Sequence, residues 1–353
     1  GNDFEGVAVA AADGSISSVE ESQAAQIAKE IGQPVQLTWP RVQEMQSMPV
    51  RTPVTARLDA GFLPASGGRI AAWRTRLAMP ATMREFGHRL FDNNTPEAAM
   101  EHAAGEADAL ACEGAVPPYG IAHVAVDHLP GTLPFPTGPM RGNAAAYTAF
   151  FTESFIDELA ERARIDPLEL RIRNHADADQ TSGKPWSGKH LLQCYQEGAD
   201  RFGWKDRPAV PRSLQRGGVQ VGWGMSTATY PGRRMPAGCR VVTDADGHVE
   251  FSSATHEVGN GVRTVMTQVA ADTAGLPIDR VSFLSGDSAF PAAPYSGASQ
   301  TTATVGSAVF AAADEWRRRF IAALVGDADS PLFGADPATV DIGTVDPRAA
   351  AAY

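Results

Sequence analysis

Hydrophobic and polar residues follow one another along the chain in patterns that predict both strands and helices. Strand character is found at residues 35–39, 56–63, 69–77, 219–229, 239–243, 249–255 and 280–284. The Asp-Ala-Asp-Gly sequence at residues 244–247 separates two of these segments, and its Asp-Gly step suits a hairpin turn. Short strands are therefore predicted in both halves of the chain.

Apolar residues at helical spacing, bounded by caps and breakers, predict the helices. The first helix begins with a Ser-Val-Glu-Glu capping box at Ser18 and stops at Gly32. Its buried stripe is expected to comprise Ala24, Ile27, Ala28 and Ile31. Further helices are predicted over residues 144–164, from 166 onward, over 189–202, over 262–274, and from a loop at 296–302 to about 324. We interpret the helical stripes as core packing.

A change of composition divides the chain into two predicted domains. Residues 206–218 combine two prolines, a glycine pair and three arginines with no apolar period, which is typical of a surface linker. We place the boundary near Pro211, so the first domain covers residues 1–210 and the second covers 211–353. Because strands and helices occur in both, the predicted fold class is α+β, with two mixed domains.

Composition and charge exclude several classes of protein. The 353 residues carry a formal net charge of −11, which disfavours a general grip on nucleic acid phosphates. The sequence has no apolar run long enough to span a bilayer. The distant Cys112, Cys194 and Cys239 argue against a disulfide framework, a zinc knuckle or an iron–sulfur cluster held by this chain. Cytoplasm and periplasm both remain open.

Three glycine-rich or serine-rich loops lead into predicted helices. They cover residues 140–143, 256–261 and 296–302, and the last two each follow a strand and are expected to be adjacent in space. A helix start presents unpaired amides and a partial positive charge, and small residues let ligand oxygens come close. Any one loop is also explained by simple capping, but three such starts suit one extended, polyanionic cofactor.

Other motifs with a known chemistry are absent or incomplete. Gly259 and Gly261 lack the third glycine of a dinucleotide fingerprint, since Thr264 takes its place, and no phosphate-binding P-loop motif occurs. Residues 224–228 are one residue short of a nucleophile elbow and lack the helix that should follow. His123 and His128 are separated by a strand-like segment, so no metal ligand set is predicted.

Several blocks, in order and spacing, resemble the molybdenum-binding large subunit of the xanthine oxidase family of molybdenum hydroxylases. The blocks are residues 140–142, 153–160, 166–174, 182–185, 202–204, 257–261 with Thr264 and Gln268, and 297–302 with Gly306. The likeness is closest to the bacterial aldehyde oxidoreductase and isoquinoline 1-oxidoreductase beta-subunit branches. It covers nearly the whole chain.

The resemblance implies two elongated domains that hold a molybdenum-pterin dinucleotide, in the cytosine form, largely through backbone amides. The metal is then bound by the pterin dithiolene, so no protein ligand to the metal is expected. The cofactor-binding residues implied by the family motifs are Phe4, Arg141, Gly142, Gly259, Asn260, Gly261, Thr264, Gln268, Ala298, Ser299, Gln300, Thr301 and Thr302. Two residues depart from the family pattern in a way that disfavours cofactor occupancy. Glu5 adds a carboxylate beside Phe4, and Asn260 stands in place of the longer glutamine.

The reaction implied by the resemblance is oxidative hydroxylation of aldehydes or N-heteroaromatic compounds, with water as the oxygen source. The implied partners are an iron–sulfur small subunit with a 2Fe-2S centre and, in some members, an FAD subunit. The family's catalytic glutamate belongs to a Gly-x-Gly-Glu motif that is absent here, so no catalytic residue is assigned. We therefore expect a truncated second domain, a portion of a larger subunit, and no activity alone. The alternative is a scaffold or interaction protein of the same fold that has lost cofactor binding.

Overall fold

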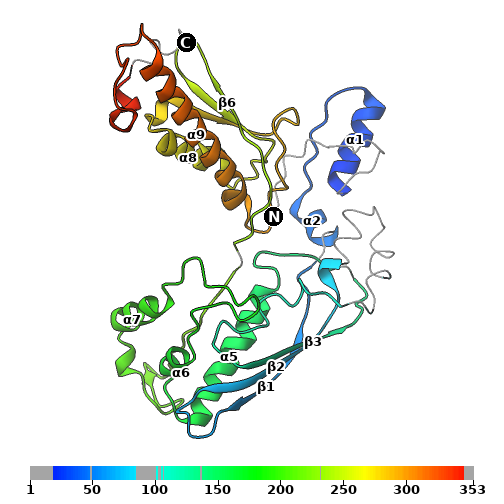
Figure 1. Ribbon diagram of the computed structural model, residues 1–353. Helices are drawn as coiled ribbons and strands as arrows, with labels where there is room; N and C mark the ends of the chain where they lie inside the picture. The colour runs from blue at the N-terminus through cyan, green and yellow to red at the C-terminus, as the bar shows by residue number, and fades with distance from the viewer. Residues whose placement is uncertain are drawn as a thin grey trace. The chain divides into compact units, whose positions relative to one another are not determined.

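The computed structural model of the chain describes residues 19–47, 50–84, 101, 105, 107–135, 137–230 and 232–345. These residues form two compact units, which divide in the sequence between Tyr230 and Pro231 (Figure 1). We call the described residues from 19 to 230 the N-terminal unit and residues 232–345 the C-terminal unit. Each unit contains both helices and strands, which agrees with the predicted α+β class.

The N-terminal unit is built on a three-stranded sheet backed by a long helix. Its strands are β1 (Thr55–Phe62), β2 (Ile70–Met79) and β3 (His123–Pro130), in the order β1-β2-β3. The first pair is antiparallel and the second is parallel. Helix α5 (Ala145–Ala163) lies along the sheet (Figure 1). Its Phe155 ring meets the buried Trp73 ring edge to face, with centroids 5.2 Å apart.

The remaining elements of the N-terminal unit are shorter. They are α1 (Val19–Ile31), α2 (Arg41–Ser47), α6 (Pro167–Arg173), α7 (Leu191–Phe202), a 3-10 turn (Trp204–Asp206), β4 (Gln215–Arg216) and β5 (Val219–Gln220). The predicted start of α6 is confirmed, because the Asp166 carboxylate accepts from the amides of Leu168 and Glu169. The predicted end of α7 is also confirmed, since Gly203 is left-handed there with φ +80°.

Three predictions for this unit differ from the structure. Residues 35–39 lie between two prolines and belong to none of the described strands or sheets. The stripe expected to be buried on α1 is only partly covered: Ile27 and Ile31 are exposed, at 38% and 57%, and Ala24 and Ala28 are half-buried. No described core cluster includes this face. The strand expected at 219–229 is only the two residues of β5.

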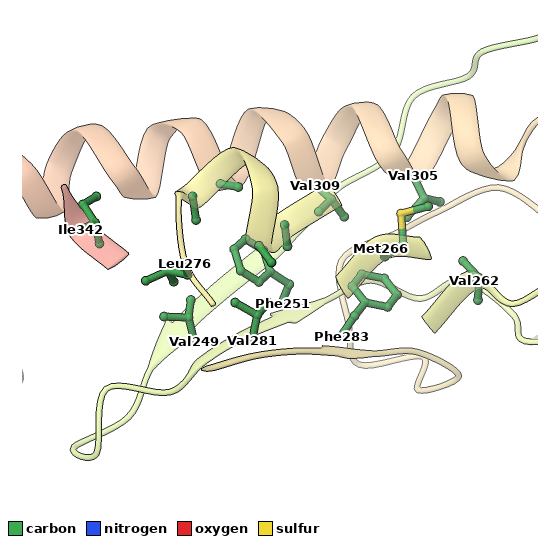
Figure 2. Close-up of a cluster of buried hydrophobic side chains, with 14 of the residues drawn as sticks. Val249, Phe251, Val262, Met266, Leu276, Val281, Phe283, Val305, Val309 and Ile342 are labelled. Atoms are coloured by element: carbon green, nitrogen blue, oxygen red, sulfur yellow. The ribbon is translucent and has the colours of Figure 1, made fainter. Parts of the chain in front are cut away.

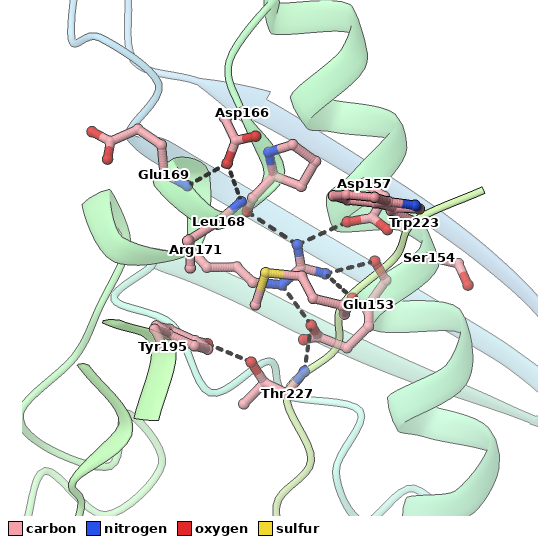
Figure 3. Close-up of polar contacts among 12 residues, drawn as sticks. Glu153, Ser154, Asp157, Asp166, Leu168, Glu169, Arg171, Tyr195, Trp223 and Thr227 are labelled. Atoms are coloured by element: carbon pink, nitrogen blue, oxygen red, sulfur yellow. Dashed lines mark hydrogen bonds and ion pairs between the residues drawn. The ribbon is translucent and has the colours of Figure 1, made fainter. Parts of the chain in front are cut away.

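The segment after β5 stays on the N-terminal unit because a buried polar network holds it. Arg171 is 1% exposed and Glu153 is 3% exposed, and their side chains pair at 2.8 Å. Arg171 Nη2 donates to the Met225 carbonyl at 3.2 Å, and the Thr227 amide donates to Glu153 Oε2 at 2.9 Å (Figure 3). The two units therefore divide after this segment, downstream of the boundary placed near Pro211.

The C-terminal unit packs two helices on a second three-stranded sheet. Its main elements are β6 (Arg240–Thr243), β7 (Val249–Ser252), α8 (Val262–Ala274), β8 (Val281–Leu284) and α9 (Thr301–Gly326), with 3-10 turns at Ile278–Arg280, Pro337–Thr339 and Ile342–Thr344. The sheet order is β6-β7-β8, antiparallel and then parallel, with α8 as the crossover. The predicted hairpin turn is confirmed, because the Asp244 amide donates to the His248 carbonyl at 3.0 Å.

The core of the C-terminal unit fixes where α8 and α9 begin. Phe251, Met266 and Val309 are fully buried, and they come from β7, α8 and α9 respectively. Figure 2 shows these side chains packed in one cluster. Because one core holds the sheet and both helices, the loops that precede the helices are fixed by the same packing.

Candidate functional site

The start of α8 is capped by a carboxylate of its own loop. Glu257 Oε1 accepts from the amides of Gly259 and Gly261, both at 3.0 Å, and Glu257 Oε2 accepts from the Arg263 amide at 3.4 Å. Gly259 and Gly261 have φ of +83° and +70°, a left-handed conformation that favours glycine. The loop therefore folds around the Glu257 side chain, and this carboxylate occupies the amides that an anion would otherwise meet.

The charge of Glu257 is stabilised by the same contacts. Partial burial raises the pKa of the Glu257 carboxyl. The hydrogen bonds from the amides of Gly261, Arg263 and Gly259, together with the Arg263 guanidinium, lower this pKa by more than burial raises it. The net result is a pKa below the ordinary value for glutamate. The Glu257 side chain is therefore ionised at neutral pH, beside the positively charged Arg263.

The implied cofactor-binding side chains around the start of α8 are exposed. Asn260 Oδ1 accepts from the Val262 amide at 3.3 Å, and its Nδ2 donates to the His256 carbonyl at 3.4 Å. Thr264 and Gln268 are also exposed, and their spacing of four residues places them on one face of α8. This helix start therefore offers hydroxyl and amide side chains, while most of its own amides are engaged.

The start of α9 is open by contrast. Ala298 and Ser299 are both left-handed, with φ of +53° and +57°, which is uncommon for residues other than glycine. No side chain caps the helix at Gln300. Within the described residues, the amides at positions 301–303 have no acceptor, whereas the Thr304 amide donates to the Gln300 carbonyl at 2.8 Å. Three donors at a helix start thus remain for a ligand.

Gln300 supplies a buried polar group at the same place. Its side chain is 1% exposed, and its Nε2 donates to the Tyr295 carbonyl at 3.2 Å. Its Oε1 has no hydrogen-bond partner in the described part of the protein. A buried acceptor without a partner costs free energy, and a bound group that donates to it would remove that cost.

The two loops of the C-terminal unit are adjacent, as predicted. Ser296 Oγ donates to the His256 carbonyl at 3.1 Å and lies 3.4 Å from Thr255 Oγ1. This contact joins the beginning of the α9 loop to the beginning of the α8 loop. It unites all the implied residues from Gly259 to Thr302 in one unit of the structure.

The other implied residues fall elsewhere. Arg141 and Gly142 lie in the N-terminal unit, immediately before α5, and Gly142 is left-handed with φ +80°. Phe4 and the neighbouring Glu5 lie outside the described residues. Glu257 was missed as a site residue, although a carboxylate two residues before a Gly-x-Gly loop was a readable signal.

The described residues also bear on metals, cysteines and membranes. Among them, no group of three or more His, Cys, Asp or Glu side chains is arranged to hold a metal ion. Cys112, Cys194 and Cys239 are all free thiols. No helix in the described ranges combines the length and apolar character needed to cross a bilayer.

Comparison with known proteins places the chain in a family. Two molybdopterin cofactor-binding domain families match residues 15–175 and 197–349. The aldehyde oxidoreductase molybdenum-binding subunit PaoC of Escherichia coli (strain K12) is 30% identical over 290 residues, which cover 80% of this chain and 38% of that protein. The putative xanthine dehydrogenase molybdenum-binding subunit XdhA of Escherichia coli (strain K12) is 34% identical over 156 residues, covering 42% and 21% respectively.

Solved structures show the same fold. The structure of quinoline 2-oxidoreductase from Pseudomonas putida 86 aligns with a TM-score of 0.66 at 17% identity, covering 94% of this chain and 44% of that one. The chain belongs to the molybdopterin cofactor-binding domain family, as a partial match to the molybdenum-binding large subunits of the xanthine oxidase family. It spans 38% of the length of PaoC.

Proposed function

We propose that this chain is part of a molybdenum hydroxylase catalytic subunit that oxidatively hydroxylates aldehydes or N-heteroaromatic compounds. Family membership supports the cofactor class, a molybdenum-pterin, and we further propose its cytosine dinucleotide form. When bound, that group supplies the redox chemistry, with water as the oxygen source. The role of this chain is to hold and orient it.

The open start of α9 is the observation that carries this proposal. Among the described residues, the amides at positions 301–303 have no acceptor and Gln300 Oε1 has no donor, and two left-handed residues precede these amides. This arrangement fits an anionic group that also carries hydrogen-bond donors. We assign Ala298, Ser299, Gln300, Thr301 and Thr302 to the phosphates and the adjoining part of the cofactor. No charged side chain of this loop opposes an anion.

The start of α8 has a different role in this proposal. Because Glu257 already fills most of its amides, a phosphate there would meet a carboxylate rather than free donors. We assign the exposed side chains of Asn260, Thr264 and Gln268, with the glycine backbone, to uncharged polar groups such as those of a pterin ring. Arg141 and Gly142 lie in the N-terminal unit, and their assignment to the cofactor rests on the family resemblance.

We propose that the chain depends on further sequence and on partner subunits for catalysis. A Gly-x-Gly-Glu motif is absent from its sequence, so the general base of the family reaction is not assigned to any of its residues. Without that base we expect no turnover from the chain alone. An iron–sulfur subunit with a 2Fe-2S centre, and in some assemblies an FAD subunit, would carry the electrons away.

A substitution at Ser299 tests the assignment of α9. Ser299 is exposed and left-handed, a conformation that Asp and Asn tolerate better than other residues. Ser299→Asp places a carboxylate beside the free amides, as Glu257 does at α8. We expect the molybdenum and pterin content to fall about tenfold or more, because the new charge repels the phosphates. Folding stability should stay level or rise by up to about 1 kcal/mol, since a negative charge suits a helix start.

The matched control is Ser299→Asn, which has nearly the same shape without the charge. The protein is produced with an iron–sulfur partner subunit in a host that makes the cofactor, and molybdenum is measured by elemental analysis. Asn should retain most of the wild-type content. Equal content in the Asp and Asn variants would show that the phosphates do not lie at the start of α9.

The capping of α8 by Glu257 favours a second candidate function. A helix start that satisfies itself needs no ligand, so a same-fold scaffold or interaction protein without cofactor is the alternative. The molybdenum content of the wild-type protein, produced with the iron–sulfur partner in the same host, distinguishes the two candidate functions. Molybdenum near one per chain supports the hydroxylase, and no molybdenum with an intact, folded chain supports the scaffold.

A further inference from the structure

Arg51 bridges the loop that carries Arg141 and Gly142. Its Nη1 donates to the Asn143 carbonyl at 3.1 Å, and its Nη2 donates to the Arg141 carbonyl at 2.5 Å. The two carbonyls are separated by one residue, so the planar guanidinium spans the bend of the loop at Gly142. The contact joins positions 90 and 92 residues apart in the sequence.

The loop adopts an unusual conformation that such a bridge can hold. Gly142 and Asn143 are both left-handed, with φ of +80° and +35°. The Asn143 amide donates to the Met140 carbonyl at 2.6 Å, and the Ala146 amide donates to the Gly142 carbonyl at 3.2 Å. These local hydrogen bonds form a turn. The Arg51 guanidinium donates to the Arg141 and Asn143 carbonyls, which the local bonds do not use.

The position of Arg51 is itself fixed by the backbone. Val50 forms a parallel bridge with Thr137, and the Gly138 amide donates to the Val50 carbonyl at 3.1 Å. The backbone next to Arg51 is therefore paired with residues 137 and 138, which lead directly into the loop at residues 140–143. Arg51, Met140, Asn143 and Tyr147 line one small hollow, which places the bridge at the wall of a recess rather than on a flat surface.

We propose that Arg51 is a positioning residue that sets the conformation of the loop at residues 140–143. It acts through the two carbonyls, so the loop presents Arg141 and Gly142 in one arrangement before any ligand binds. Two guanidinium groups, Arg51 and Arg141, then stand at one loop of a chain with a net charge of −11. The consequence for cofactor retention rests on the proposed function.

The first experiment measures amide hydrogen exchange over residues 138–148 in the 353-residue chain without cofactor. In Arg51→Met, exchange of the loop should rise about tenfold, because both bridging bonds are lost. In Arg51→Lys, the charge remains but one ammonium cannot span both carbonyls as the fork does, so an intermediate rise of about threefold is expected. Arg57→Met is the matched control, because Arg57 is an exposed arginine of β1 near Asp59 at 3.6 Å.

Exchange confined to the loop distinguishes positioning from a general loss of fold. Strands β1 to β3 should exchange as in the wild type in all three variants. Unchanged loop exchange in Arg51→Met would overturn the proposal, and so would a rise spread evenly over the N-terminal unit.

A second measurement connects the loop to the cofactor. With the iron–sulfur partner and a host that makes the cofactor, molybdenum content should fall in the order wild type, Arg51→Lys, Arg51→Met, with Arg57→Met like the wild type. A loosened loop with wild-type molybdenum content would overturn the link to retention. A wild type without molybdenum would contradict the proposed function, while the exchange data would still decide the role of Arg51 in the loop.

Discussion

Helices α8 and α9 begin beside each other in the C-terminal unit, yet they treat their first amides in opposite ways. At α8, Glu257 accepts from three amides of the loop and helix start. At α9, the amides at positions 301–303 have no acceptor in the described residues. The same order of strand, small-residue loop and helix thus gives amides that are hydrogen-bonded to a carboxylate at α8 and amides that are open at α9.

A helix start can therefore bind a ligand through its first amides only where no group of the chain already accepts their hydrogen bonds. Both starts have left-handed residues, and both lie on one hydrophobic core. What separates them is a single carboxylate within reach of the loop amides. Under the proposed function, anionic groups of the cofactor would lie at the start of α9 and uncharged groups at the start of α8.

Truncating a side chain of the shared core should destabilise α8 and α9 together, and with them both helix starts. Phe251 is fully buried, so Phe251→Ala is expected to cost about 3–5 kcal/mol of unfolding free energy. Chemical denaturation measures the loss, and hydrogen exchange should rise in α8 and α9 alike because both pack on this side chain's cluster. Phe310→Ala, at a position 57% exposed, should change stability by less than about 0.5 kcal/mol. A rise in one helix only would show that the helices do not share one cooperative core.

Removing the cap of α8 should separate the two starts. Glu257→Ala is expected to cost about 1–2 kcal/mol, because the loop amides lose their acceptor. Hydrogen exchange should rise over residues 257–266 and stay unchanged at the start of α9. Glu257→Gln retains an oxygen acceptor, so it should recover part of the loss. An equal effect at both helix starts would contradict the independence of the two loops.

The pH dependence of the free energy of unfolding tests, with a smaller expected effect, whether the charge of Glu257 stabilises the start of α8. The pKa of Glu257 is depressed in the folded chain, so its carboxylate contributes stability above the unfolded pKa and loses it as pH falls through the folded pKa. The wild type should therefore lose more stability than Glu257→Gln between pH 5 and the acid side of the folded pKa. Denaturation midpoints at several pH values measure this difference. Parallel curves would show that the Glu257 charge does not contribute to the cap.

The sequence predicted local structure well wherever neighbouring residues decide it. The Asp244 turn, the Asp166 cap and the glycine that ends α7 are set by side chains and backbone within a few residues. Predictions failed where burial or pairing was needed from far away. Residues 35–39 have strand character but join none of the described sheets, and Ile31 has helical spacing but is 57% exposed and belongs to no described core cluster.

The family resemblance, the strand-loop-helix order and the positions of the small residues at each helix start can all be read from the amino-acid sequence. Which of those helix starts is open depends on the folded structure, because side chains such as Glu257 fold back onto the loop amides and accept their hydrogen bonds. The folded structure also decided that Arg51 holds a loop 90 residues away, a contact that no local pattern encodes. Propensity and capping act over a few residues, whereas such contacts form only when the core brings distant segments together.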